Sequence, residues 1–179
     1  MQVAHRTFYQ KLRRNGVRVK FLVYDLLGVK MPHYFLPGNV EGLNLWLQVV
    51  VENDGAICIS ESTMKDLKKW IKENNCKTSC LFKTTWSHIG AYTSAVKSSK
   101  GLPSESDSVL KDLNAKFSFL LVGTLEPRKG HLQVLETFEI LWKKGLSLNL
   151  VIVGKQGWMV EELVGKLKLK LNRILFSIQ

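Results

Sequence analysis

Two adjacent cations, Arg128 and Lys129, stand in a short loop bounded by Gly123 and Gly130, with the sequence GTLEPRKG. An arginine can bind two phosphate oxygens at once, and a lysine adds a mobile point charge. Glycines let the backbone approach a ligand closely. The loop therefore favours a phosphate ligand, although an ordinary turn with two solvated cations explains the same residues equally well. It matches neither the Walker A pattern nor the three-glycine dinucleotide fingerprint.

The elements around this loop predict how it is positioned. Residues 117–122 form a short apolar run typical of a buried strand, a helical pattern follows from Leu132 to Trp142, and residues 148–153 form a second apolar run. This order is the βαβ unit, whose two strands are parallel. Because parallel sheets bind ligands at the carboxyl ends of their strands, the loops 123–130 and 154–157 are expected at one ligand-binding edge.

The first half of the chain predicts a second parallel sheet. Three strand-like runs are expected there, at 16–27, 55–59 and 80–83. Two helical patterns lie between them, at 40–52 and 61–73, and Ser60 is expected to be the N-cap of the second. Residues 94–112 are rich in Ser, Lys, Gly and Pro, which predicts a linker. The expected fold class is therefore α/β, with two parallel-sheet domains.

Several segments carry a family resemblance. VGTLEPRKGH and LNLVIVGKQGWMVEEL resemble the donor-binding domain of family-4 glycosyltransferases of the GT-B fold, in particular the bacterial mannosyl- and rhamnosyltransferase-like proteins of O-antigen and exopolysaccharide synthesis. FLVYDLLGVKMPHYF, ICISESTMKDLKKW and WSHIGA resemble the acceptor side of the same family. The resemblance implies two partial Rossmann-like domains. Residues 1–93 would be the later part of the acceptor-side domain, 94–116 the interdomain linker, and 117–179 the first part of a truncated donor domain.

The resemblance also implies an activity and a donor site. The reaction would be the retaining transfer of a hexose from a nucleotide-diphospho-sugar to a glycan or lipid-linked acceptor. The resemblance implies mannose as the hexose and GDP-mannose as the donor. No cofactor and no metal are expected. Lys129 would bind the donor diphosphate, and Thr124 stands where the family often has Arg. The donor-binding residues implied in this way are Gly123, Thr124, Arg128, Lys129, Gly154 and Lys155.

On the acceptor side, Asp25 and His88 are expected to approach the interdomain cleft. Two alternatives stay open, since Asp25 can instead cap the loop 26–30 and a lone histidine is often structural. Gly28 and Tyr92 stand where the family usually has Pro and Asp.

The family's two glutamates separated by seven residues, which hold the donor sugar and ribose, have no match in this sequence, so the catalytic residues stay unknown. The chain is therefore expected to be a fragment that is inactive alone. The alternative function is an inactive truncated remnant that at most binds nucleotide diphosphates or a membrane surface.

The chain of 179 residues has a net charge of +11, concentrated in its first twenty residues and in 166–173. Basic proteins favour anionic partners, but no nucleic-acid motif is visible, so no nucleic acid is expected. Solvated helix faces are the preferred interpretation over attraction to an anionic membrane. Without an apolar span or a secretory signal, a cytoplasmic location is expected, with peripheral contact at the inner face of the plasma membrane. Cys58 is expected to be a buried thiol, and the spacing of Cys76 and Cys80 is poor for zinc.

Overall fold

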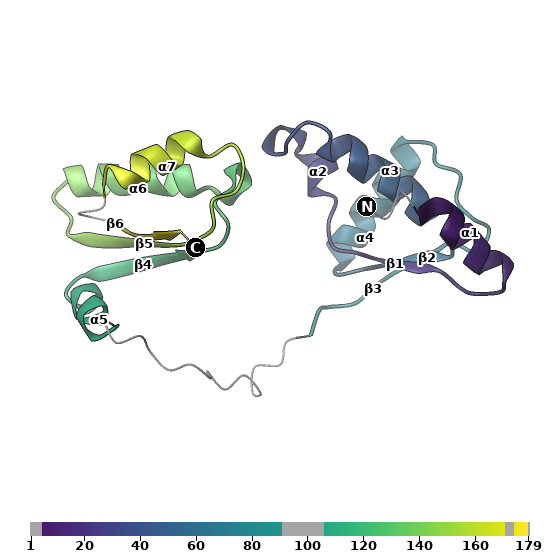
Figure 1. Cartoon of the computed structure of the whole chain (residues 1–179), viewed down its shortest axis with the longest axis horizontal. Coiled ribbons are helices and arrows are strands. Elements are labelled where there is room, and N and C mark those ends of the chain that lie inside the picture. Colours follow the sequence, from purple (N-terminus) through teal and green to yellow (C-terminus); the bar gives the residue numbers. More distant parts are fainter. Residues whose placement is uncertain (1–4, 91–105, 171–173, 179) are drawn as a thin grey trace. The chain divides into compact units, whose positions relative to one another are not determined.

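The computed structural model describes residues 5–90, 106–170 and 174–178. It divides the chain into two compact units, Met1–Ala95 and Val96–Gln179. Each unit contains a three-stranded parallel sheet with its own helices (Figure 1). The predicted α/β class with two parallel sheets is therefore confirmed.

The sheet of the first unit has the strand order β1-β2-β3. Its strands are β1 (Lys20–Val23), β2 (Gly55–Cys58) and β3 (Lys83–Trp86), and its helices are α1 (Arg6–Arg14), α2 (Leu27–Lys30), the 3-10 turn η2 (Pro32–Tyr34), α3 (Asn39–Val51) and α4 (Glu61–Glu73). The predicted helices are confirmed, as is the cap of α4, where the Ser60 side chain accepts the Thr63 N–H at 3.1 Å.

Two strand predictions in this unit were wrong in extent. β1 covers only part of 16–27, and β3 begins at Lys83 instead of occupying 80–83. The residues just before β3 form a turn instead, in which the Phe82 N–H donates to the Ser79 carbonyl at 3.0 Å. The ladder starts where Lys83 comes opposite Gly55 of β2.

Helix α1 was not predicted, and ion pairs attach it to the rest of the first unit. Arg6 pairs with Glu52, and Arg13 contacts Asp54 through Nε at 3.1 Å. The same guanidinium donates to the Glu52 carbonyl at 2.6 Å and to the Ser79 hydroxyl at 2.7 Å. Arg6 and Arg13 therefore do not belong to a merely solvated helix face.

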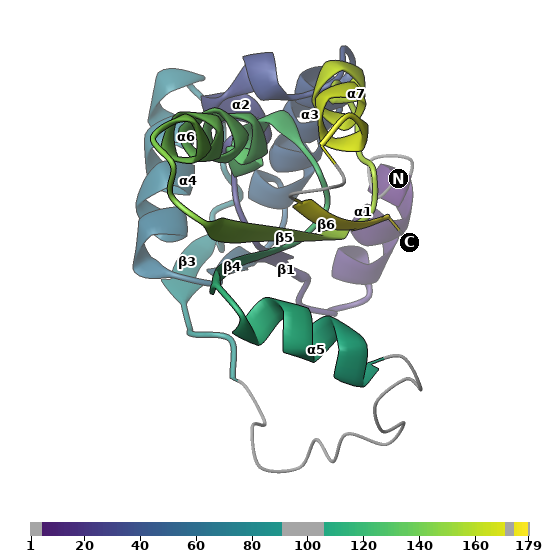
Figure 2. The same ribbon diagram turned by 90° about the vertical axis from the view of Figure 1, so that its left-hand side faces the viewer.

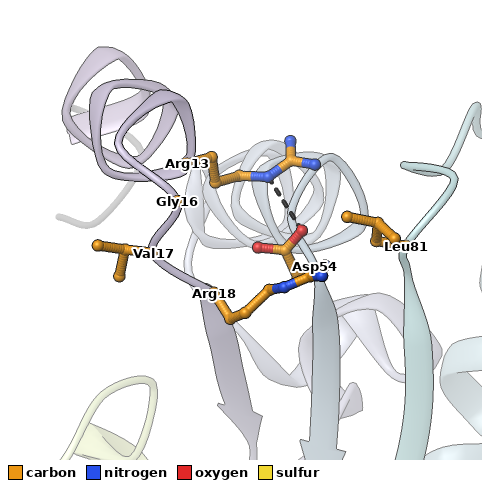
Figure 3. A pocket seen from close by; sticks show the side chains of 6 residues that line it. All are labelled: Arg13, Gly16, Val17, Arg18, Asp54 and Leu81. Carbon is orange, nitrogen blue, oxygen red and sulfur yellow. Dashed lines mark hydrogen bonds and ion pairs between the residues drawn. The ribbon is translucent and has the colours of Figure 1, made fainter.

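Asp54 is the buried partner in this arrangement, with 4 % of the residue exposed. Its second oxygen accepts the Val19 N–H at 2.8 Å. A cavity of about 260 Å³ lies beside the pair, and Figure 3 shows Arg13, Arg18 and Asp54 in its wall; the remaining lining residues are Gly16, Val17 and Leu81. Val19 precedes β1 and Asp54 precedes β2, so this cavity lies at the amino edge of the sheet, opposite the edge where parallel sheets bind ligands.

The sheet of the second unit has the order β4-β5-β6. Its elements are α5 (Ser106–Asn114), β4 (Phe117–Val122), the 3-10 turn η3 (Pro127–Lys129), α6 (His131–Lys143), β5 (Leu148–Gly154), α7 (Glu161–Lys168) and β6 (Ile174–Ile178). The predicted βαβ unit is confirmed in the register that pairs Phe117 with Leu148. The sheet has a third strand beyond the predicted βαβ unit, because β6 pairs with β5 in parallel.

The segment predicted as linker is partly helical. Helix α5 occupies 106–114, and the Ser118 hydroxyl of β4 donates to the Leu113 carbonyl at 2.8 Å. Residues 94–105 of the predicted linker lie outside the described residues. The boundaries 1–93, 94–116 and 117–179 therefore stay predictions.

Strand β4 is exposed, although its apolar sequence predicted a buried strand. Helices α6 and α7 lie on one face of the sheet, and α5 lies on the other side of β4 (Figures 1 and 2). β4 is an edge strand, and its residues Phe117, Leu120 and Val122 are 82 %, 63 % and 74 % exposed. The core of this unit forms between β5, α6 and α7 instead, around Leu135, Leu150, Ile152 and Leu167. None of the described helices is long and apolar enough to cross a membrane.

Candidate functional site

The two loops predicted to share the ligand-binding edge lie against each other. The Leu125 N–H donates to the Lys155 carbonyl at 2.8 Å, and the Gly157 N–H donates to the Leu125 carbonyl at 3.0 Å. Leu125 itself is fully buried and pairs with Gln156 as in a parallel bridge. The loops 123–130 and 154–157 are therefore one structure at the carboxyl ends of β4 and β5.

Two glycines of this structure are required by the packing of one loop on the other. A Cβ built on Gly154 would lie 2.0 Å from the Gly123 carbonyl oxygen, and one built on Gly157 would lie 2.4 Å from the Leu125 carbonyl oxygen. No side chain fits at these distances. The sequence assigned Gly154 to donor binding, and the structure supplies a packing reason for it; its ligand role stays a prediction.

The loop delivers Lys129 to the start of α6. The 3-10 turn Pro127–Lys129 ends at Gly130, which has a left-handed φ of 70° and is the N-cap of α6. No side chain caps this helix end, so its first N–H groups keep their capacity to bind an acceptor. An exposed lysine beside uncapped N–H groups and a positive helix dipole is a favourable environment for a phosphate.

Arg128 has a protein partner that the sequence analysis did not assign. Its Nε lies 2.7 Å from Oε2 of Glu126, whose side chain is only 9 % exposed, whereas the Arg128 side chain is 27 % exposed. The signal in the sequence was a carboxylate two residues before the arginine in the same loop. Arg128 is thus held by an ion pair and is not a solvated cation.

His131, the first residue of α6, was also missed as a member of this region. It is 4 % exposed, and its Nδ1 is buried without a hydrogen-bond partner among the described residues. Burial lowers the pKa of His131, the nearby Lys129 charge lowers it further, and the Glu126 charge opposes both. The imidazole is therefore neutral at pH 7.

This lowered pKa predicts a pH dependence of stability for the second unit. The pKa of His131 in the folded unit lies below its ordinary value of 6.5, so the unfolded chain binds this proton more readily. The contribution of neutral His131 to stability is therefore fully present above pH 6.5 and is lost as the pH falls. We expect the α6 amides to lose hydrogen-exchange protection as the pH falls below about 6.5, and to lose less in His131→Gln. His131 is the only histidine in residues 96–179, and an unchanged pH profile in the variant would contradict this expectation.

Thr124 and Lys155 complete the predicted donor set. Thr124 is half-buried and its methyl group borders Gly157, while Lys155 is exposed and uses its carbonyl to hold Leu125. The structure thus places all six predicted donor residues in the two adjoining loops of the second unit. Their contact with a donor stays a prediction.

The two acceptor-side residues follow strands of the first unit. Asp25 comes after β1, is exposed, and accepts the Leu27 N–H at 3.0 Å, which is the loop-capping alternative. His88 comes after β3, is exposed, and packs edge-to-face on Trp86 with ring centroids 5.1 Å apart. Both therefore have local structural contacts, and a role at a cleft stays a prediction for each.

Across the described part of the chain, no three His, Cys, Asp or Glu side chains gather in a way that could hold a metal ion. Cys58 is buried as predicted, and burial raises the pKa of its thiol while the Lys68 charge opposes that rise.

No family model matches the chain. In sequence it is 39% identical over 178 residues to a serotype-specific mannosyltransferase WbdA of Escherichia coli, covering 97% of this chain and 22% of that protein. A second WbdA protein of E. coli is 40% identical over 173 residues, covering 94% of this chain and 21% of that protein. The chain thus spans about a fifth of the length of these curated relatives.

In structure the chain is similar to an alpha,alpha-trehalose-phosphate synthase (UDP-forming) from Burkholderia vietnamiensis, with a TM-score of 0.63 and 13% identity over 97% of this chain and 45% of that one. At this identity the likeness concerns the fold alone, while the relatedness in sequence rests on the mannosyltransferases. The chain is thus similar in sequence to a part of these mannosyltransferases, and in fold to a trehalose-phosphate synthase.

Proposed function

We propose that this chain is a segment of a hexosyltransferase and that loop 123–130 binds the diphosphate of its nucleotide-sugar donor. The observation that carries this proposal is the exposed Lys129 at the uncapped start of α6, on the carboxyl edge of a parallel sheet. The relatives are named mannosyltransferases, which supports mannose as the sugar and GDP-mannose as the donor.

The chemistry follows from where charge develops. Breaking the bond between the sugar and the nucleotide leaves negative charge on the diphosphate, and fixed positive groups that meet this charge lower the barrier. Lys129 and the first N–H groups of α6 supply such groups without a metal or cofactor, and none is proposed. The acceptor is proposed to be a glycan or lipid-linked glycan of cell-surface polysaccharide synthesis, reached at the cytoplasmic face of the membrane.

Lys129→Ala is expected to weaken the binding of GDP to the purified chain by about tenfold or more, because a charge-assisted contact to phosphate contributes ~1.5–3 kcal/mol. Titration calorimetry at fixed salt measures the effect. Lys144→Ala is the matched control, since it removes an exposed lysine that follows the opposite end of the same helix. Equal GDP affinity in Lys129→Ala and the unaltered chain would contradict the proposed function.

A binding module without turnover is the second candidate. The sequence lacks the paired glutamates of the family, which favours binding over catalysis for these 179 residues. That the chain transfers no sugar by itself stays a prediction.

A further inference from the structure

We propose that Glu126 is a positioning residue, which fixes the Arg128 guanidinium so that its free nitrogens meet the donor diphosphate. This inference rests on the proposed donor site. It assigns a role to the Glu126 carboxylate, which has none in the family resemblance or in the named relatives.

The Glu126 side chain is buried beside Arg128. Glu126 is 7 % exposed, and a buried carboxylate is costly unless it is paired. It forms an ion pair with Nε of Arg128 at 2.7 Å, in which Oε2 and Nε are both buried and the contact lacks hydrogen-bond geometry. Contact through Nε leaves the two terminal nitrogens of the guanidinium for another acceptor, and the contacts of the described residues include no second ion-pair partner for Arg128.

Glu126 is fixed by both loops. The preceding Leu125 is fully buried and hydrogen-bonded to the second loop. The Glu126 carbonyl accepts the Lys129 N–H at 3.0 Å, and its Cγ would lie 3.3 Å from a Cβ on Gly157. A carboxylate held in this way orients its partner before the ligand arrives, which reduces the ordering cost of binding.

Glu126 also brings a negative charge to the proposed anion site. A carboxylate beside an anion site repels the anion and offsets one of the two cations of the loop. If Glu126 acted through its charge alone, its removal would strengthen the binding of a nucleoside diphosphate. If Glu126 orients Arg128, its removal weakens that binding. The two interpretations therefore predict opposite signs.

The experiment measures the affinity of the full chain for GDP in Glu126→Gln, which keeps the shape of the side chain and removes its charge. We expect binding about tenfold weaker than that of the unaltered chain. Glu126→Asp keeps the charge but shortens the reach to Arg128, and it should show a comparable loss. Unchanged or tighter binding in Glu126→Gln would overturn the proposal.

A double variant separates positioning from a general effect on the loop. Glu126→Gln with Arg128→Gln should bind GDP within about twofold of Glu126→Gln alone, because an unheld Arg128 already contributes little. A further tenfold loss in the double variant would show that Arg128 binds the diphosphate without help from Glu126. The double variant also avoids leaving the buried carboxylate without its cation.

Hydrogen exchange of the Leu125 and Gly157 amides reports whether the two loops remain joined. Weaker GDP binding with normal protection of these amides supports positioning, whereas lost protection would show that Glu126 holds the loop itself and would overturn the proposal. If Lys129→Ala weakens binding and Glu126→Gln does not, the proposed function stands and this inference fails. A chain that binds no GDP contradicts the proposed function and overturns this inference with it.

Discussion

Replacement of Gly154 by alanine is expected to destabilise the second unit by about 3 kcal/mol, the upper end of overpacking costs. The new Cβ would lie 2.0 Å from the Gly123 carbonyl oxygen, so the two loops must separate. Separation strains the hydrogen bond from the Gly123 N–H to the Val153 carbonyl, 2.9 Å long, and the pairing of Leu125 with the second loop. Hydrogen exchange of the β5 amides measures the loss within this unit.

Gly165→Ala is the matched control for this prediction. Gly165 lies within α7, and a Cβ there would meet nothing within 4 Å. Alanine in a helix interior should stabilise the same unit by about 0.5–1 kcal/mol. If Gly154→Ala proved as stable as the unaltered chain, the close approach of the two loops would not be what requires glycine at this position.

Asp54→Ala is expected to destabilise the first unit by about 3 kcal/mol, the lower end for breaking a buried ion pair, because Arg13 remains partly exposed. The change leaves the Val19 N–H without its acceptor and removes the ion pair of Arg13, which keeps its hydrogen bonds to Glu52 and Ser79. Helix α1 should loosen as a consequence. Exchange of the β1 and β2 amides measures the stability change, and exchange of the α1 amides measures the loosening.

Asp66→Ala provides the comparison for this variant. Asp66 pairs with Lys30 at 2.7 Å, but Lys30 is exposed and Asp66 is only half-buried, so its loss should cost no more than about 1 kcal/mol. Similar losses in the two variants would show that burial of Asp54 does not set its contribution. Asp54→Asn keeps one oxygen acceptor and is expected to fall between them.

The sequence by itself determined the elements whose signals are local. The apolar periodicity of α3, α4 and α6, the N-cap at Ser60 and the apolar runs of β4 and β5 appear in the structure where their patterns predicted them. These signals are local because a helix face or a cap depends on residues within a few positions of one another. The motif around Lys129 was likewise sufficient to indicate a glycosyltransferase resemblance, in line with the sequence similarity to the mannosyltransferases.

Only the tertiary structure decided which surfaces are covered. β4 has the apolar sequence of a buried strand, yet it lies at a sheet edge with exposed side chains. The start of β3 depended on the residue that faces Gly55, and the pairing of α1 depended on the burial of Asp54. Each of these outcomes joins residues far apart in the chain, so no local pattern contains it.

The candidate site divides in the same way. The type and spacing of Arg128 and Lys129 predicted an anion-binding loop, because cations near a helix start favour phosphate whatever surrounds them. The burial of Glu126 and the role of Gly154 required the second loop in place. A carboxylate becomes buried, and a Cβ becomes impossible, only when backbone from another part of the chain packs against the position; that is a property of the folded unit and not of the segment.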